Sequence, residues 1–97
     1  MLTKEKILDT LRYNKSYFEK ELGVIKIGLF GSYAKETQEP GSDVDILVEL
    51  DEQSWNKFCG VWNILEKQLN TKVDLVRKGP HLREKFMRTL ENEIIYA

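Results

Sequence analysis

Three aspartates, Asp43, Asp45 and Asp74, are the residues whose types and spacing best fit catalysis in this sequence. Asp43 and Asp45 alternate with apolar residues up to Leu50, a pattern typical of a half-buried strand. On such a strand their carboxylates share one face, with Cα atoms about 6.5–7 Å apart. Alternation alone would also explain both as ordinary solvent-facing residues. Asp74 favours a shared site, because it lies within the apolar string Val-Asp-Leu-Val and a lone carboxylate is costly to bury.

A cluster of these carboxylates would select a divalent cation. Two like charges about 4 Å apart repel by roughly 4 kcal/mol at an effective dielectric constant of about 20. A divalent cation removes that repulsion, and hard oxygen ligands select Mg²⁺ or Mn²⁺. Two such ions, about 3.5–4 Å apart, can neutralise a triphosphate and bind both oxygens of an in-line displacement. If the strand of Asp74 lies beside that of Asp45, we expect Asp43, Asp45 and Asp74 to be metal ligands and catalytic residues.

The pair Gly31-Ser32 is a candidate phosphate site ahead of the aspartates. It directly follows the β-rich run Ile25–Phe30, as in a strand that enters a tight turn. Gly31 lets the backbone approach phosphate oxygens, amides that open a helix point at an anion, and the Ser32 hydroxyl adds a donor. A bare Gly-Ser turn is also a common structural element, so its weight comes from its position before the acids. The sequence contains no Walker-type GxxxxGK[ST] loop.

The string Gly31-Ser32, ten residues, then Asp43-Val44-Asp45 resembles the signature of the minimal nucleotidyltransferases. These proteins are small relatives of the polymerase-beta superfamily, and the resemblance is greatest to the antitoxins that are paired with HEPN-domain toxins. It covers most of the chain, from about residue 24 to residue 88. It implies an α/β nucleotidyltransferase fold, ATP as substrate, and a HEPN-type toxin as protein partner.

The resemblance also implies roles for individual residues. Asp43 and Asp45 would hold the two metal ions, and Asp74 would bind the catalytic metal and help to activate the acceptor hydroxyl. We assign nucleotide binding to the turn and its polar neighbours, namely Gly31, Ser32, Lys35 and Ser42. The family usually has glycine and then often glutamate after the basic position, where this chain has Glu36 and Thr37. This departure leaves the shape of the loop open, although every metal-binding position is present.

Composition predicts one soluble domain, 1–97, because 41% of the residues are hydrophobic and 32% are charged. No apolar run approaches the roughly 20 residues of a membrane span, and the amino terminus has no signal-peptide pattern. The single cysteine, Cys59, excludes an internal disulfide and fits a reducing cytoplasm. With His81 as the only histidine, a His/Cys zinc site is implausible.

Charge is close to balanced overall but unevenly placed. A net charge of −1 argues against general nucleic-acid binding. The stretch 36–52 holds seven acids and no base, whereas the stretch 77–88 is mostly basic. Each stretch can be interpreted as a solvated face. In the functional interpretation, the acidic stretch collects metal ions and faces the basic stretch, a patch suited to triphosphate or an acidic partner.

The remaining pattern predicts helices and strands in the order α-β-α-β-α-β-α around a small mixed sheet. The first helix begins after Thr3 and stops at Gly23, and the helix after the aspartate strand is capped by Asp51 or Ser54. The expected strands are 24–30, 44–50 and 72–77. The first helix is expected to end at about residue 22, a short helix to span 32–37, the second long helix to end at about residue 70, and the last helix to span about 81–90. The tail 93–97 fits a helix extension, an edge strand or a partner contact.

The aromatic residues of the second long helix are interpreted as core rather than as a cofactor site.

The aspartates, the Gly-Ser turn and the family resemblance together predict a Mg²⁺-dependent nucleotidyltransferase that moves AMP from ATP onto a hydroxyl. The resemblance implies that this hydroxyl belongs to a tyrosine of a cognate toxin. A non-catalytic module that neutralises its partner by contact is the alternative from another class. A small-molecule or antibiotic transferase is disfavoured, because little chain remains outside the catalytic core for a substrate pocket. The oligomeric state is left open.

Overall fold

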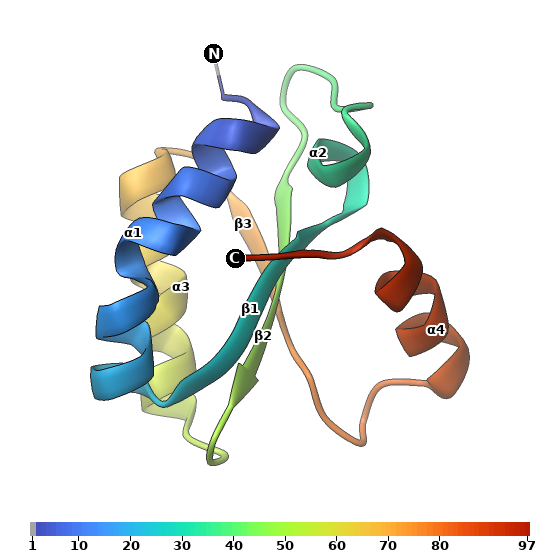
Figure 1. The fold of residues 1–97 in the computed structure, drawn as a ribbon. Helices are drawn as coiled ribbons and strands as arrows, with labels where there is room; N and C mark the ends of the chain where they lie inside the picture. The colour runs from blue at the N-terminus through green and yellow to red at the C-terminus, as the bar shows by residue number, and fades with distance from the viewer. Residues whose placement is uncertain (1) are drawn as a thin grey trace.

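The computed structural model describes residues 2–97 and shows a mixed α/β fold (Figure 1). Along the chain the elements are α1 (Lys4–Leu22), β1 (Val24–Phe30), α2 (Gly31–Lys35), β2 (Val44–Leu50), α3 (Trp55–Leu69), β3 (Val73–Arg77), α4 (Glu84–Glu93) and β4 (Ile95–Tyr96). The expected α/β class with a small mixed sheet is therefore confirmed.

Local capping explains where the two long helices begin and end. The Thr3 hydroxyl accepts a hydrogen bond from the Lys6 amide at 3.2 Å, and Gly23 ends α1 with a left-handed φ of 66°. Ser54, not Asp51, caps α3, because its hydroxyl accepts from the Lys57 amide at 3.2 Å. Both strands flanking the Gly-Ser turn have their predicted bounds.

The last helix differs from its predicted span. It begins at Glu84 rather than near His81, because a turn closed by the Leu82 amide on the Gly79 carbonyl at 3.1 Å precedes it. It also continues to Glu93. The short Gly-Ser helix occupies Gly31–Lys35 instead of 32–37.

The sheet has the strand order β3-β2-β1-β4, with β2 and β3 parallel and the other neighbours antiparallel. The tail forms the edge strand among its three predicted alternatives, since Ile95 and Tyr96 pair with Leu29 and Gly28. Gly28 permits this pairing, because a Cβ atom there would stand only 2.8 Å from the Ile94 side chain.

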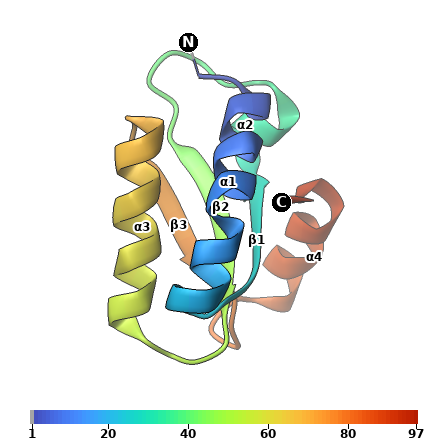
Figure 2. The same cartoon turned by 60° about the vertical axis from the view of Figure 1, so that its left-hand side comes forward.

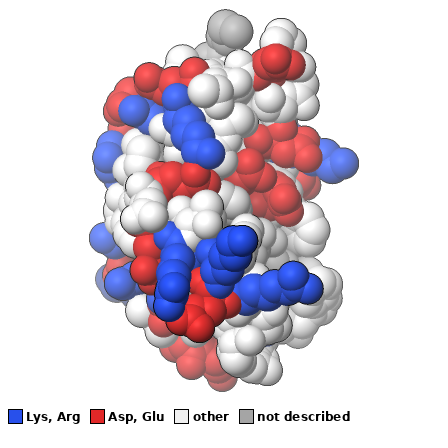
Figure 3. Space-filling model, turned by 90° about the vertical axis from the view of Figure 1, so that its right-hand side faces the viewer, with Lys and Arg blue, Asp and Glu red and all other residues white. Residues whose placement is uncertain are grey.

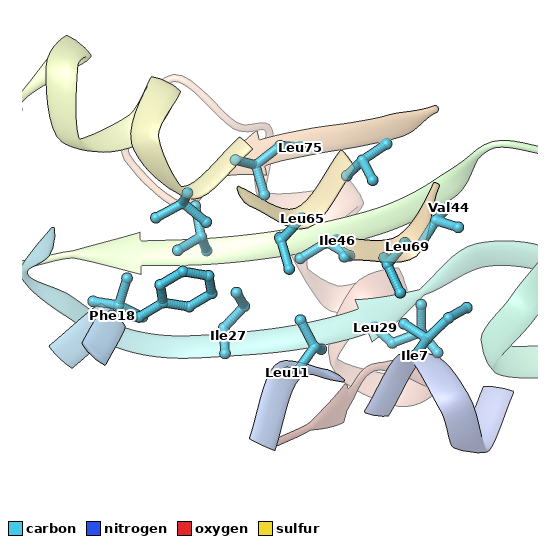
Figure 4. Close-up of a cluster of buried hydrophobic side chains, with 14 of the residues drawn as sticks. Ile7, Leu11, Phe18, Ile27, Leu29, Val44, Ile46, Leu65, Leu69 and Leu75 are labelled. Carbon is cyan, nitrogen blue, oxygen red and sulfur yellow. The ribbon is translucent and has the colours of Figure 1, made fainter. Parts of the chain in front are cut away.

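The sheet is covered on both faces, which gives three layers. Helices α1 and α3 lie side by side over one face (Figure 2) and bury the larger core with Ile46 and Leu65 at its centre (Figure 4). Helix α4 covers the other face, where Phe30, Leu47 and Leu90 form a second cluster. Leu47 lies on the aspartate face of β2 and is 2% exposed, so the middle of this face is covered.

One aromatic residue of α3 is not in the core as predicted. Phe58 is buried, but Trp55, the first residue of the helix, is 70% exposed and stacks on Phe58. Within residues 2–97, no helix has the length and apolar character needed to cross a membrane.

Candidate functional site

The predicted site residues gather at the end of the sheet where β1 stops and β2 and β3 begin. Asp45 is the register partner of Phe30 on antiparallel β1 and of Asp74 on parallel β3. Gly31 follows Phe30 directly, and Asp43 immediately precedes β2. The pairing of three strands, and not sequence proximity, therefore brings the Gly-Ser turn and the acids together.

Asp45 is the centre of this cluster. Its burial, followed by the negative charges of Asp74 and Asp43, raises the pKa of its carboxyl group from 3.8 to about 6. A side-chain hydrogen bond with Asp74 and the charge of Glu93 act in the same direction. The site therefore concentrates negative charge that a proton, or a cation, would relieve.

Asp43, Asp45 and Asp74 offer only oxygen ligands, which are the ligands that a hard divalent cation prefers. Within residues 2–97, no three acidic, histidine or cysteine side chains already stand in a metal-binding arrangement. Asp45 and Asp74 are register partners on adjacent strands, and Asp43 is exposed just before β2. The metal-ligand set therefore stays a prediction, supported by the mutual repulsion of its members.

Gly31 is required by the contact between the turn and the acids. Its φ is 76°, and a Cβ atom at this position would collide with the Asp45 carboxylate. Glycine alone combines this left-handed conformation with so close an approach. Ser32 is half-buried beside it, and its carbonyl accepts from the Thr37 amide at 2.9 Å to close the short helix. The turn thus approaches the acidic cluster most closely at Gly31, beside Asp45.

Glu36, which departs from the family pattern, occupies a position that favours glycine. It caps α2 with a left-handed φ of 60°, and its side chain forms a 3.5 Å ion pair with Lys4. Left-handed backbone costs a non-glycine residue about 1–2 kcal/mol. The loop therefore keeps the shape that a glycine would give it, at some cost in stability.

Lys35 and Ser42 occupy the rim of the site. The Lys35 ammonium forms a 2.8 Å ion pair with Glu93 at the end of α4. The Ser42 hydroxyl accepts from the Glu39 amide at 2.9 Å and so closes the turn before Asp43. Both residues thus have structural contacts beside the nucleotide-binding role predicted for them.

Glu93 is an acidic neighbour of the site that the sequence pattern did not indicate. Its side chain is 19% exposed, pairs with Lys35 and contributes to the raised pKa of Asp45. It reaches the site because α4 folds back over the sheet and β4 pairs with β1. No local pattern in the tail could have revealed this, since the position depends wholly on tertiary packing.

Charged side chains of both signs interleave on the α4 side of the molecule (Figure 3). Two cations of the basic stretch form ion pairs with nearby acids. Lys78 lies 3.5 Å from Glu49, and Arg88 lies 2.7 Å from Glu84. The basic stretch is thus partly a solvated, internally paired surface, which is one of its two predicted interpretations.

Comparisons with known proteins agree with this geometry. A family model described as polymerase beta, nucleotidyltransferase matches residues 14–97. The protein adenylyltransferase MntA of Thermococcus cleftensis is 39% identical over 98 residues, which cover 100% of this chain and 98% of that protein. A chain from the crystal structure of a toxin–antitoxin with AMP-PNP superposes with a TM-score of 0.68 at 26% identity, covering 98% of this chain and 72% of that chain.

A more distant solved structure shares the fold. It is the complex of tri-AMPylated Shewanella oneidensis HEPN toxin with MNT antitoxin, matched with a TM-score of 0.58 at 22% identity over 96% of this chain and 66% of that chain. At this identity the likeness supports the fold alone.

Proposed function

Because this chain belongs to the polymerase beta nucleotidyltransferase family, we propose that it transfers AMP from ATP to a hydroxyl group of another protein. The observation that carries the proposal is the register pair Asp45–Asp74 packed against Gly31. This arrangement joins a carboxylate pair to a turn that admits phosphate, within a chain 39% identical over its whole length to a protein adenylyltransferase. Residues 1–97 act in this proposal as one catalytic domain.

Each residue has a definite task in the transfer. Gly31 admits the triphosphate to the backbone, the Ser32 and Ser42 hydroxyls donate to phosphate oxygens, and the Lys35 ammonium offsets their charge. The acceptor oxygen bonds to the α-phosphorus, the bond to the β-phosphate oxygen breaks, and pyrophosphate leaves. Asp74, next to the acceptor, takes part in removing the hydroxyl proton.

Asp43, Asp45 and Asp74 would hold Mg²⁺, with Mn²⁺ as a substitute. When bound there, the metal supplies charge neutralisation of the triphosphate and polarises the reacting oxygens. The protein's own contribution is to hold the three carboxylates at the mouth of the turn, where their repulsion favours cation binding.

The acceptor in this proposal is a tyrosine of a cognate HEPN-type toxin, and the chain acts as the antitoxin in the cytoplasm. The similar structure with AMP-PNP is itself a toxin–antitoxin, which supports both the nucleotide and the partner. The absence of a second cysteine fits a reducing compartment.

Matched radiolabels test the proposal. The protein, the product of its neighbouring gene and Mg²⁺ are incubated with α-labelled or γ-labelled ATP. We expect the α label alone to enter the partner, and both Asp43→Asn and Asp45→Asn to abolish incorporation. A partner that is neutralised equally well by these variants without any label would instead establish inhibition by contact. Entry of the γ label would establish phosphate transfer rather than AMP transfer.

A further inference from the structure

One of the two edges of the sheet is strand β3, which pairs with β2 alone among residues 2–97. The carbonyl of Lys72 and the amide of Lys78 both bond to β2. Backbone groups of successive strand residues point to opposite sides, so Val73, Leu75 and Arg77 direct theirs away from the sheet. Such outward groups are a template for pairing with another strand.

Only at Val73, at the start of this edge, do the outward backbone groups have hydrogen-bond partners among residues 2–97. The Trp62 indole N–H donates to the Val73 carbonyl at 2.8 Å, and the Val73 amide donates to the Glu66 carboxylate at 2.9 Å. Both side chains come from α3, so this helix occupies the outward groups of Val73. Within residues 2–97, no side chain makes an equivalent contact with the backbone of Leu75 or Arg77.

The open part of the edge lies in a cavity of about 560 Å³. Its lining includes the open strand, the start of α3 and the loop before α4, with Trp55, Phe58, Leu75, Arg77, His81 and Leu82 among its residues. The Trp55 ring stacks on Phe58 at a centroid distance of 5.6 Å and is nevertheless 70% exposed. Arg77 has no ion pair among the described residues.

We propose that the open edge Leu75–Arg77 binds an extended segment of the acceptor protein as an added strand. Main-chain hydrogen bonds to Leu75 and Arg77 supply pairing, an apolar side chain of the segment packs on Trp55, and an acidic side chain pairs with the Arg77 guanidinium. That the occupant is an acceptor protein rests on the proposed AMP transfer. The pairing surface itself rests on the geometry of β3.

The location of the edge favours an acceptor over other occupants. Asp74 immediately precedes Leu75, and a strand advances only about 3.3 Å per residue, so a bound segment passes close to the catalytic cluster. A second copy of this chain is a poorer match. The same edge on a copy, Leu75–Arg77, carries no acidic side chain that could pair with the Arg77 guanidinium.

Two variants of the cavity test this docking against the product of the neighbouring gene. Trp55→Ala and Arg77→Glu each weaken its binding by about tenfold or more in calorimetry, as expected for an aromatic or arginine anchor. Tyr13→Ala is the matched control, because Tyr13 is 81% exposed on α1, and it leaves the affinity unchanged. All three variants keep Mg·ATP affinity within about twofold of the unmodified chain, since none of these residues contacts the catalytic cluster. Cavity variants that bind the partner as well as the control does would overturn the proposal.

Hydrogen exchange locates the contact. On addition of the partner, we expect the Leu75 and Arg77 amides to become strongly protected while the Val73 amide, already bonded to Glu66, changes little. A bound partner that leaves Leu75 and Arg77 unprotected would overturn the docking mode even if AMP is transferred. Protection with binding but no transfer would support the docking and reject the proposed activity. Protection that rises with the concentration of this protein alone would identify a second copy as the occupant instead. If the partner does not bind at all, the proposal that an acceptor protein docks on this edge is wrong.

Discussion

Replacing Asp45 with Asn is expected to stabilise the metal-free protein at about pH 8 while abolishing AMP transfer. Burial, then the charges of Asp74 and Asp43, raises the pKa of Asp45 from 3.8 to about 6. Because the folded-state pKa exceeds the unfolded one, folding favours the protonated carboxyl. Its contribution to stability is complete below pH 3.8 and is lost as the pH rises through about 6. Asparagine has no charge to bury and does not incur this loss.

The size of the effect follows from the change in pKa. At about 1.36 kcal/mol per pKa unit, ionising Asp45 in the fold costs about 3 kcal/mol. The residue is only half-buried, so solvent screening reduces the expected gain to about 1–2 kcal/mol. For a domain of this size, this corresponds to a rise of about 5–15 °C in the midpoint of thermal unfolding.

Thermal unfolding between about pH 5 and pH 8 in EDTA measures this gain. We expect the advantage of Asp45→Asn over the unmodified chain to be largest at high pH and to shrink toward pH 5. Asp9→Asn is the control, because the exposed Asp9 forms only a 3.2 Å surface ion pair with Arg12 and should show no such trend. Adding Mg²⁺ should stabilise the unmodified chain and leave Asp45→Asn unchanged. An Asn variant that is less stable at pH 8, or an advantage that does not vary with pH, would refute the reasoning.

Three further substitutions test other parts of the account. Asp74→Asn should keep Mg·ATP affinity within a few-fold but lower turnover by orders of magnitude. If calorimetry shows nucleotide binding lost as severely as for Asp45→Asn, Asp74 does not serve mainly the acceptor side. Gly31→Ala should destabilise the fold in urea by about 1–3 kcal/mol more than Gly41→Ala, because both have positive φ but only the first would collide with Asp45. Gly28→Ala should lower stability by about 1–3 kcal/mol and make the tail more sensitive to carboxypeptidase, because its Cβ would press on Ile94; a tail as resistant as in the unmodified chain would count against this.

Much of the fold could be predicted because its signals are local. Thr3 and Gly23 define the ends of α1, and the alternating run Val44–Leu50 has the period of a strand. These features depend on neighbours within a few residues. The site was accessible for a different reason: Asp74 in its apolar string indicated a neighbouring strand that also carries acids, and Asp45 is indeed its register partner. The supposed cost of burying a lone carboxylate does not apply, however, because Asp74 is exposed on β3.

What could not be predicted depends on contacts between distant segments. The sequence left the tail with three alternatives, and the choice of the edge strand β4 depends on its packing against β1, where Gly28 leaves room for Ile94. The same fold-back carries Glu93 to Lys35, which the sequence did not indicate. Trp55 matches the apolar stripe of α3 by spacing, yet as the first residue of the helix it is 70% exposed. Helical periodicity gives direction around an axis, but it does not show how far along the axis the buried face extends.

The central claim is that this chain adds AMP to a partner protein, and mass spectrometry of that partner tests it most directly. The purified product of the neighbouring gene is incubated with the chain, ATP and Mg²⁺, and its intact mass and peptides are compared with those from a reaction containing Asp45→Asn. We expect one or more added AMP groups on tyrosine with the unmodified chain and none with the variant. A partner of unchanged mass, with AMP found only on small molecules or nowhere, would contradict it.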